Sequence, residues 1–382
     1  MSSQFISLFS GVGGSAFGAR AAGYELVGAV EFDKKIADLY YENHQSMVLT
    51  QDVKDVDPTI FSVDQSKTLT VQLSPPCQEW SGANCNPDIT SDRALALDNC
   101  YHILEHLNPD RIIIENVRAY QQSEPMERFR YWLEINGYSY IEQVINCANI
   151  GVPQSRIRYF LMAVKKGEMV RHLPLTHSSK GAGQGDLFSH PLKPWVGWYE
   201  AIKDLIPDMQ ITKLSANQQL ALRDWELKHP ILIEGRTRSR FGNGKDDQLT
   251  IRSGYEPSIT VQASDSAPNK IPRLLIPTIG YHSELPPIYS EHQLAPTVKA
   301  MMMSDGKSER KGCWRLIDNC EVRETSVRAL ARLQTFPDDL ILSRHKGLAC
   351  KVIGNAVPPL VMQKILEECF QDEIYNQFNR SL

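Results

Sequence analysis

Cys77 is the residue whose setting best suits covalent chemistry. It follows Pro75 and Pro76 at the end of an apolar, strand-like run, TLTVQLS at 68–74. Ligands bind at the carboxyl ends of strands in open α/β sheets, and two prolines stiffen the chain at that point. A lone cysteine usually packs in the core, but a thiol displayed at this edge is better placed to act as a nucleophile.

The eight cysteines of this 382-residue chain include no Cys-x-x-Cys pair. Scattered cysteines are typical of reduced thiols in a cytosolic protein. We therefore expect neither disulfides nor a zinc site, and no other metal.

Glu115 and Asn116 end a nearly continuous apolar run, IIIENV at 112–117. A carboxyl group half-embedded among apolar side chains has its neutral form favoured, so it can donate a proton near neutral pH. An acid at a strand end that faces water fits the same run equally well. Further on, Arg156 and Arg158 are two residues apart, which predicts that they share one face of a strand. Paired guanidinium groups suit a carbonyl oxygen or a phosphate, and surface salt bridges are the alternative.

A glycine-rich segment, FSGVGGSAFGAR at 9–20, directly follows the first predicted strand. Gly11, Gly13 and Gly14 allow a tight turn and a close approach of bare backbone to a ligand. Glu31 comes 17 residues after Gly14, at the end of the second predicted strand, where a carboxylate can accept hydrogen bonds from ribose hydroxyls. The pattern predicts a nucleoside cofactor and leaves NAD and S-adenosylmethionine open.

Apolar runs alternate with helical patterns over the first part of the chain, which predicts an α/β fold with a mostly parallel sheet covered by helices on both faces. From 171 to 322, Pro-rich stretches and short β-like runs indicate a smaller, mostly irregular or β domain. From 323 to 382 the pattern is helical again, so the smaller domain is inserted into the larger one. Within this last part, VIGNAVPP at 352–359 is expected to be a strand-to-helix turn. The predicted strands lie at 5–9, 25–31, 68–74, 111–117, 138–145 and 158–164.

The composition is that of a globular protein: 42% of residues are hydrophobic and 23% are charged. No apolar stretch approaches the roughly 18 residues that would indicate a membrane span, and the first residues lack the basic start of a signal peptide. The net charge is −4, but residues 171–320 hold 19 Lys and Arg against 16 Asp and Glu, a net +3. This asymmetry is compatible with a polyanionic partner and also with a solvated charged surface.

Together these segments closely resemble the C5-cytosine DNA methyltransferases. That family has six motifs in order: F-x-G-x-G-G, P-C-Q, E-N-V, Q-x-R-x-R, R-x-x-x-R-L-Q-x-F-P and G-N-A-V-P-P. All six occur here in that order, over roughly 1–165 and 322–360, and the region between them is unmatched, as in the family. They lie at Phe9–Gly14, Pro76–Gln78, Glu115–Val117, Gln154–Arg158, Arg328–Pro337 and Gly354–Pro359.

The resemblance implies a Rossmann-like fold and a role for each matching residue. Cys77 would add to C6 of cytosine, which makes C5 nucleophilic enough to take a methyl group. Glu115 would protonate or hydrogen-bond N3. Arg158, with Arg156 nearby, would hold O2. The target base would be flipped out of the duplex.

The cofactor implied by the resemblance is S-adenosylmethionine. Glu31 would bind its ribose, Phe32 would lie against its adenine, and Asp52 would accept from the adenine amino group. The residues implied to contact the cofactor are Phe9, Gly11, Val12, Gly13, Gly14, Glu31, Phe32, Asp52, Val53, Pro76, Asn355 and Val357.

The implied partner is double-stranded DNA, read by the inserted domain, in a monomeric bacterial cytoplasmic enzyme paired with a restriction endonuclease. Glu79 and Trp80 depart from the usual glycine and phenylalanine of the family. A tRNA-directed relative, an NAD-linked oxidoreductase and a degenerate DNA-binding protein are the alternatives. The residues expected at the DNA are Gln78, Ser81, Arg236, Arg238, Arg240, Thr260 and Thr297.

Overall fold

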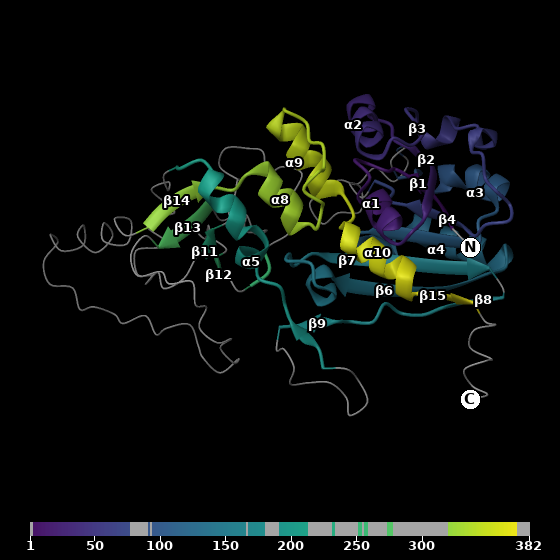
Figure 1. The fold of residues 1–382 in the computed structure, drawn as a ribbon. Helices are drawn as coiled ribbons and strands as arrows, with labels where there is room; N and C mark the ends of the chain where they lie inside the picture. The colour runs from purple at the N-terminus through teal and green to yellow at the C-terminus, as the bar shows by residue number, and fades with distance from the viewer. Residues whose placement is uncertain are drawn as a thin grey trace, which may run out of the picture.

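The computed structural model describes residues 3–76, 91, 94–165, 167–179, 191–212, 231–233, 251–253, 256–258, 273–277 and 320–372. Its largest element is a seven-stranded sheet with the order β3-β2-β1-β4-β5-β7-β6 (Figure 1). Neighbouring strands run parallel from β3 to β5, and β7 is antiparallel to both β5 and β6. These strands are β1 (Gln4–Leu8), β2 (Glu25–Val30), β3 (Val48–Leu49), β4 (Leu69–Leu73), β5 (Arg111–Asn116), β6 (Tyr138–Asn146) and β7 (Ile157–Lys165).

Helices cover both faces of this sheet, so the predicted α/β fold class is confirmed. Buried residues of α3 and α4 pack on one face, and those of α1 and α10 pack on the other. The described α-helices are α1 (Gly14–Ala21), α2 (Lys34–His44), α3 (Tyr101–Leu107), α4 (Glu124–Ile135), α5 (Trp198–Ile202), α8 (Val327–Leu333), α9 (Lys346–Asn355) and α10 (Pro359–Glu368).

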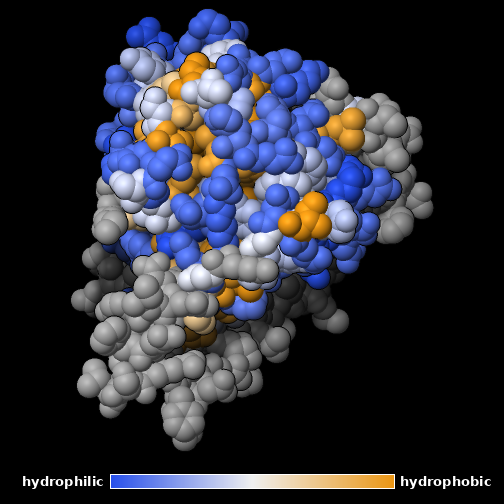
Figure 2. All heavy atoms as spheres, turned by 90° about the vertical axis from the view of Figure 1, so that its right-hand side faces the viewer, coloured by the Kyte–Doolittle hydropathy of each residue, from blue (hydrophilic) through white to orange (hydrophobic). Residues whose placement is uncertain are grey.

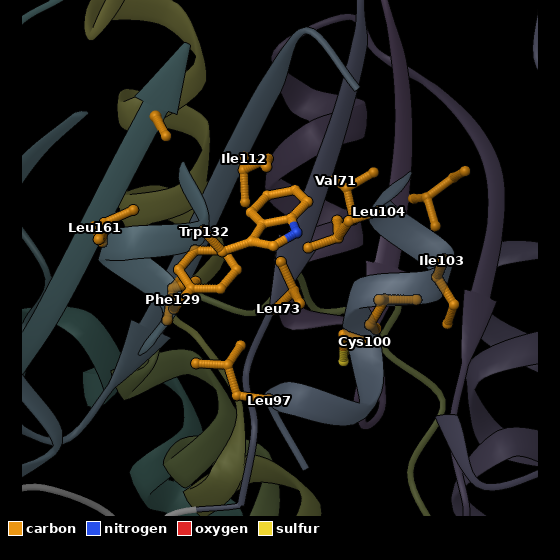
Figure 3. Packing of buried hydrophobic residues seen from close by; sticks show 14 of the residues in the cluster. Val71, Leu73, Leu97, Cys100, Ile103, Leu104, Ile112, Phe129, Trp132 and Leu161 are labelled. Atoms are coloured by element: carbon orange, nitrogen blue, oxygen red, sulfur yellow. The ribbon is translucent and has the colours of Figure 1, made fainter. Parts of the chain in front are cut away.

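The period-2 alternation of a strand divides β5 between these two cores. Ile112 and Ile114 join the cluster that includes Phe129 and Trp132 of α4, whereas Ile113 joins the cluster under α10. Figure 3 shows the first cluster, in which Trp132 lies among side chains of the sheet and of α3. Because β5 is buried on both faces, its sequence is nearly all apolar until it reaches Glu115.

A separate antiparallel sheet has the order β12-β11-β13-β14. The expected boundary between 322 and 323 falls inside β14 of this sheet. Its strands are β11 (Ile231–Ile233), β12 (Ile251–Ser253), β13 (Arg273–Pro277) and β14 (Cys320–Glu324). Two short pairs complete the described strands: β8 (Glu168–Val170) with β15 (Phe370–Asp372), and β9 (His177–Ser178) with β10 (Lys193–Pro194).

Figure 2 shows the side of the molecule that lies to the right in Figure 1; hydrophilic residues cover most of it, with hydrophobic residues between them. Among the described residues, no helix combines the length and apolar character needed to cross a bilayer.

The expectation for 352–359 is wrong in its first half. Residues 346–355 form helix α9, and a short turn leads directly into α10. Val352 and Ile353 are buried beside Leu330 and Phe336, and Ile353 follows the buried Ala349 by four residues, as on one face of a helix. Tertiary packing therefore overrides the β propensity of these residues.

Helix α1 lies against the start of α10, although nearly the whole chain separates them in sequence (Figure 1). A Cβ atom at Gly14 would lie 2.2 Å from the carbonyl oxygen of Val357, and one at Gly18 would lie 2.5 Å from that of Pro359. Both neighbours are backbone atoms, so the two segments approach more closely than any larger residue allows.

We expect Gly14→Ala to lower the free energy of unfolding by about 1–3 kcal/mol, because the added methyl group overlaps a backbone carbonyl that has no rotamer to change. Urea unfolding of wild type and variant measures this. Ala21→Ser, at the exposed end of the same helix, is the control and should leave the midpoint unchanged. An unchanged midpoint for Gly14→Ala would contradict the close packing.

Candidate active site

The segments that follow four neighbouring parallel strands meet at one edge of the sheet. Leu8 pairs with both Val30 and Leu73, and Leu73 pairs with Ile114, so β1, β2, β4 and β5 end at one level. The glycine loop, Glu31, the Ser74–Pro76 segment and Glu115 therefore lie together at the carboxyl edge, where ligands bind in open α/β sheets.

The glycine loop is shaped by three residues with left-handed backbone. Phe9, Gly11 and Gly13 have φ of 59°, 56° and 88°. Only glycine adopts such values freely, so Phe9 holds a conformation that few side chains take. The resulting path points the Gly11 amide at Glu31, whose Oε2 accepts from it at 3.0 Å.

Both carboxylate oxygens of Glu31 accept a backbone hydrogen bond, because Oε1 also accepts from Asp33 at 2.9 Å. Burial raises the pKa of Glu31, and the two backbone donors oppose that rise. Each carboxylate oxygen has a second lone pair, so the group is oriented yet still able to accept from a ligand hydroxyl.

The residues around Glu31 offer an apolar face and another acid. Phe32 is 74% exposed, which is unusual for a large apolar ring and suits a stacking surface. Asp52 follows β3, the strand next to β2, and accepts from the Lys54 amide at 3.1 Å. Val53 beside it is buried, and Pro76 is partly buried at the end of the segment that follows β4.

Glu115 is buried at the end of β5 and lies between two partners. The Ser74 hydroxyl donates to its Oε2 at 3.1 Å, and Arg158 Nε lies 3.2 Å from its Oε1. The Arg158 contact has ion-pair distance without hydrogen-bond alignment, since Oε1 has no hydrogen-bond partner among the described residues. One oxygen of the carboxyl group is thus held firmly and the other remains able to bond elsewhere.

Asn116 fixes the chain that leads to Cys77. Its side-chain amide donates to the Pro75 carbonyl at 3.0 Å, and its side-chain oxygen accepts from the Val117 amide. Pro75 is therefore tied to the end of β5, two residues before Cys77. Cys77 itself lies outside the described residues, as do all seven residues expected at the DNA: Gln78, Ser81, Arg236, Arg238, Arg240, Thr260 and Thr297.

The two arginines that the sequence pairs have different partners. Arg158 lies in β7 and faces Glu115, whereas Arg156 precedes β7 and is buried against the turn that follows α9. Arg156 donates to the Gly354 carbonyl at 2.9 Å and to the Ala356 carbonyl at 3.1 Å. Its guanidinium group supports backbone at this point.

Gln334, which the sequence did not single out as a site residue, supports the same turn. Its side-chain amide donates to the carbonyls of Ile353 and Ala356. The last segments of the chain are thereby held with Asn355 exposed and Val357 buried against α1. The Q-x-R-x-R and R-L-Q segments meet around a third motif, G-N-A-V-P-P.

His44, at the end of α2, contacts the backbone of the glycine loop. Nothing in the sequence indicated this role. Its Nε2 lies 3.2 Å from the Val12 carbonyl, which can only accept, so Nε2 carries the hydrogen. A Cβ atom at Gly13 would lie 2.0 Å from this ring nitrogen. Burial lowers the pKa of His44 to about 4, so the ring is neutral at physiological pH.

The described cysteines whose side chains are placed are buried: Cys100, Cys147, Cys350 and Cys369. Burial raises the pKa of Cys147 to about 11 and that of Cys369 to about 12, so these thiols are protonated core groups. No group of three or more His, Cys, Asp or Glu within the part of the chain that the structure describes is arranged to hold a metal ion.

Comparison with known proteins decides the family. The family model of C-5 cytosine-specific DNA methylases matches residues 3–371. The chain belongs to this family. It is a DNA (cytosine-5-)-methyltransferase, and the NAD-linked alternative is set aside.

Several relatives of this methyltransferase share most of its length. The Type II methyltransferase M.FnuDI of Fusobacterium nucleatum is 25% identical, over 97% of this chain and 96% of the relative. A tRNA (cytosine(38)-C(5))-methyltransferase of Schizosaccharomyces pombe is 28% identical, but over only 42% of this chain and 49% of the relative. Among solved structures, the S. pombe Dnmt2 methyltransferase covers 96% of this chain and 98% of its own, with a TM-score of 0.58 and 16% identity, so that likeness shows the fold alone.

We expect the stability of the methyltransferase to fall between pH 6.5 and pH 4 in a way that depends on His44. The folded pKa of about 4 lies below the ordinary value of 6.5, so acid protonates the unfolded chain first. The full difference corresponds to roughly 3 kcal/mol. Urea unfolding at pH 7 and pH 5 measures the part of this difference that is lost by pH 5, about 2 kcal/mol, and His44→Asn should flatten the pH dependence.

Three other groups face His44. Tyr40 and Phe17 contact its ring, and Arg20 adds a small electrostatic effect that lowers the pKa further. His172→Asn, at an exposed histidine, is the matched control and should keep the wild-type slope. Equal losses of stability on acidification in His44→Asn and in wild type would contradict the pH dependence assigned to His44.

Proposed function

We propose that the enzyme transfers a methyl group from S-adenosylmethionine to C5 of cytosine in one specific double-stranded DNA sequence, through a covalent bond between Cys77 and C6. The observation that carries this proposal is the tie between the chain entering Cys77 and the end of β5. Ser74 donates to Glu115, and Asn116 donates to the Pro75 carbonyl. A nucleophile two residues beyond Pro75 therefore starts from a fixed point beside an acid.

The residues at this edge suit the reaction that cytosine requires. C5 of the ring is a poor nucleophile until a bond forms at C6. The Cys77 sulfur supplies that bond, and Glu115 supplies a proton or hydrogen bond at N3, so the ring electron pair moves to C5. S-adenosylmethionine, when bound, supplies the methyl group. Departure of the C5 proton then lets the carbon–sulfur bond break and returns Cys77.

Arg158 complements Glu115 in this scheme. Its side chain is 15% exposed and reaches Glu115 Oε1, so a base placed against Glu115 also meets a guanidinium group. A guanidinium donor beside the cytosine O2 would stabilise charge that develops on the ring. Arg156 is assigned a positioning role instead, because both terminal nitrogens of its guanidinium group donate to the carbonyls of Gly354 and Ala356.

The glycine loop and its neighbours fit a nucleoside cofactor. Glu31 is oriented by two backbone donors, and the exposed Phe32 ring and the Asp52 carboxyl lie at neighbouring strand ends. The left-handed backbone at Gly11 and Gly13 brings bare main chain to the site. S-adenosylmethionine carries no phosphate, so close approach suffices and no anion cradle is required. Phe9, Val12, Gly14, Val53, Pro76, Asn355 and Val357 complete the proposed cofactor contacts.

The DNA is assigned to the inserted region from 171 to 322, between catalytic parts at 1–170 and 323–382. Its local net charge is positive over 171–320. The target base must leave the duplex stack, which costs a few kcal/mol, so contacts from this region and from the segment after Cys77 are required. The proposed contacts are Gln78, Ser81, Arg236, Arg238, Arg240, Thr260 and Thr297.

The biological role that fits is protection of host DNA in a bacterial restriction-modification system. Relatives such as M.FnuDI are Type II methyltransferases. The proposal implies a monomeric enzyme that works where the bacterial chromosome is, in the cytoplasm, beside an endonuclease that cuts the same sequence.

Incubation with tritiated S-adenosylmethionine and unmethylated genomic DNA, followed by bisulfite sequencing, tests the proposal. We expect label at C5 of cytosine in one repeated short sequence. Cys77→Ser should abolish the label, because a hydroxyl group is too weakly nucleophilic to form the bond to C6. Cys369→Ala, at a buried thiol, should retain it.

The same assay with tRNA tests the second candidate substrate, which the partial match to a tRNA methyltransferase favours. Label in tRNA and none in DNA would move the substrate to RNA. The absence of label in both, despite bound cofactor, would leave a DNA-binding protein with an inactive site.

Arg156→Lys and Arg158→Lys should separate support from catalysis. Lysine cannot donate to two carbonyls through a planar fork, so Arg156→Lys should lose about 1–3 kcal/mol of stability. Arg158→Lys should lose less than about 1 kcal/mol, because lysine keeps a positive charge beside Glu115 and Arg158 donates to no carbonyl of the α9 turn. Methyl transfer should nevertheless fall roughly tenfold or more, since lysine lacks the planar guanidinium donors. Thermal unfolding and single-turnover rates measure the two effects. Equal effects of both variants on stability and on rate would contradict the division.

A further inference from the structure

A row of polar side chains crosses one face of the central sheet and ends at Glu115. Ser7 of β1, Gln72 of β4 and Ser74 just after β4 lie in this row. Ser7 and Gln72 are paired residues of adjacent strands, and each is 1% exposed. Their strand neighbours on this face, Phe5 and Ile113, belong to the apolar core under α10. Burying a polar group in such a setting costs free energy unless the group is hydrogen-bonded.

The hydrogen bonds in this row all run in one direction. The Ser7 hydroxyl donates to Gln72 Oε1 at 2.8 Å, and Gln72 Nε2 donates to Ser74 Oγ at 2.7 Å. The Ser74 hydroxyl then donates to Glu115 Oε2 at 3.1 Å. No member of the row shares its hydrogen with a second acceptor among these contacts.

The direction is set at the Glu115 end of the row, where Oε2 accepts from the Ser74 hydroxyl. A carboxylate only accepts, so the single hydrogen of the Ser74 hydroxyl must point to it. Ser74 Oγ is then the acceptor for Gln72, whose amide must present nitrogen to Ser74 and oxygen to Ser7. With the amide reversed, Ser74 would donate to Gln72 and leave Glu115 without this donor.

The consequence concerns which oxygen of Glu115 reacts. Oε2 is occupied as an acceptor, whereas Oε1 has no hydrogen-bond partner among the described residues. We propose that Ser74, backed by Gln72 and Ser7, is a positioning residue that holds Oε2 and so presents Oε1 of Glu115 to the ring nitrogen of the target base. This inference rests on the proposed function of Glu115.

A purely structural role for the row predicts a different order of substitution effects than a positioning role does. The sheet face itself tolerates an unpaired hydroxyl, since Thr70 Oγ1, two residues before Gln72, is buried with no hydrogen-bond partner among the described residues. If the row served packing alone, substitution of the fully buried Ser7 or Gln72 would lower the rate more than substitution of the partly exposed Ser74. If it positions Glu115, the effect on rate must be largest at Ser74 and decrease along the row.

The test is a single-turnover methylation series with Ser74→Ala, Gln72→Leu and Ser7→Ala, measured with tritiated S-adenosylmethionine and unmethylated DNA. We expect the rate to fall roughly tenfold for Ser74→Ala, less for Gln72→Leu and least for Ser7→Ala, with DNA and cofactor affinity within about twofold of wild type. Ser74→Thr keeps the hydroxyl group and should restore most of the rate. Thr70→Val, which removes a neighbouring buried hydroxyl outside the row, should keep the wild-type rate.

A double-mutant cycle decides whether Ser74 acts through Glu115. Ser74→Ala should have no further effect on the residual rate of Glu115→Gln, because the group it positions is already altered. A full Ser74→Ala effect in that background would overturn the inference, as would a wild-type rate for Ser74→Ala alone; both leave the proposed function intact. A wild-type enzyme that methylates neither DNA nor tRNA would overturn the proposed function and this inference with it.

Discussion

The buried guanidinium group of Arg156 is the constraint on which the arrangement of this methyltransferase depends. A charged side chain that is 2% exposed must be surrounded by acceptors, and the structure provides the carbonyls of Gly354 and Ala356. Those carbonyls are available only because α9 ends at this point and leaves its last backbone acceptors unpaired. The end of one helix thus provides the acceptors for a charged side chain that is 198 residues away in sequence from Gly354.

From that contact the position of the glycine loop follows. The turn held by Arg156 and Gln334 presents the Val357 carbonyl to Gly14, at the start of α1. The same helix begins at the glycine loop, whose other side rests on His44 and whose Gly11 amide orients Glu31. Backbone atoms, which have no rotamers, make most of these contacts. The loop is therefore preorganised, with little conformational freedom left to lose on binding.

The sequence predicted the scaffold better than the contacts within it. Alternating apolar runs predicted all the long strands of the main sheet, because strands such as β5 that are buried on both faces read as continuous apolar segments. The prediction of a strand end at 352–355 was wrong because Val352 and Ile353, which favour strands, are buried in helix α9, where burial outweighs local propensity. The glycine loop and Glu31 were found together, since their spacing reflects one local strand–turn–helix unit.

Long-range partners left no such local signal. Arg156 and Arg158 share a residue type and a spacing, yet only the fold decides that one meets a helix end and the other meets Glu115. His44 and Gln72 look like ordinary members of an amphipathic helix and a buried strand, and their roles depend on what neighbouring strands place beside them.

The distribution of the motifs along the chain has a physical explanation in this arrangement. Several motif residues form one side of a contact whose other side lies far away in sequence: Gly14 with Val357, Arg156 with Gly354, and Asn116 with Pro75. Such contacts tolerate little change on either side, because one partner is a backbone atom and the other is a glycine or a buried hydrogen-bond donor. Within the described part of 171–320, Ser258 exchanges backbone hydrogen bonds with Pro153 and Ser155 beside Arg156. Because both partners of these bonds are backbone atoms, this contact constrains the residue type less than the other three contacts do.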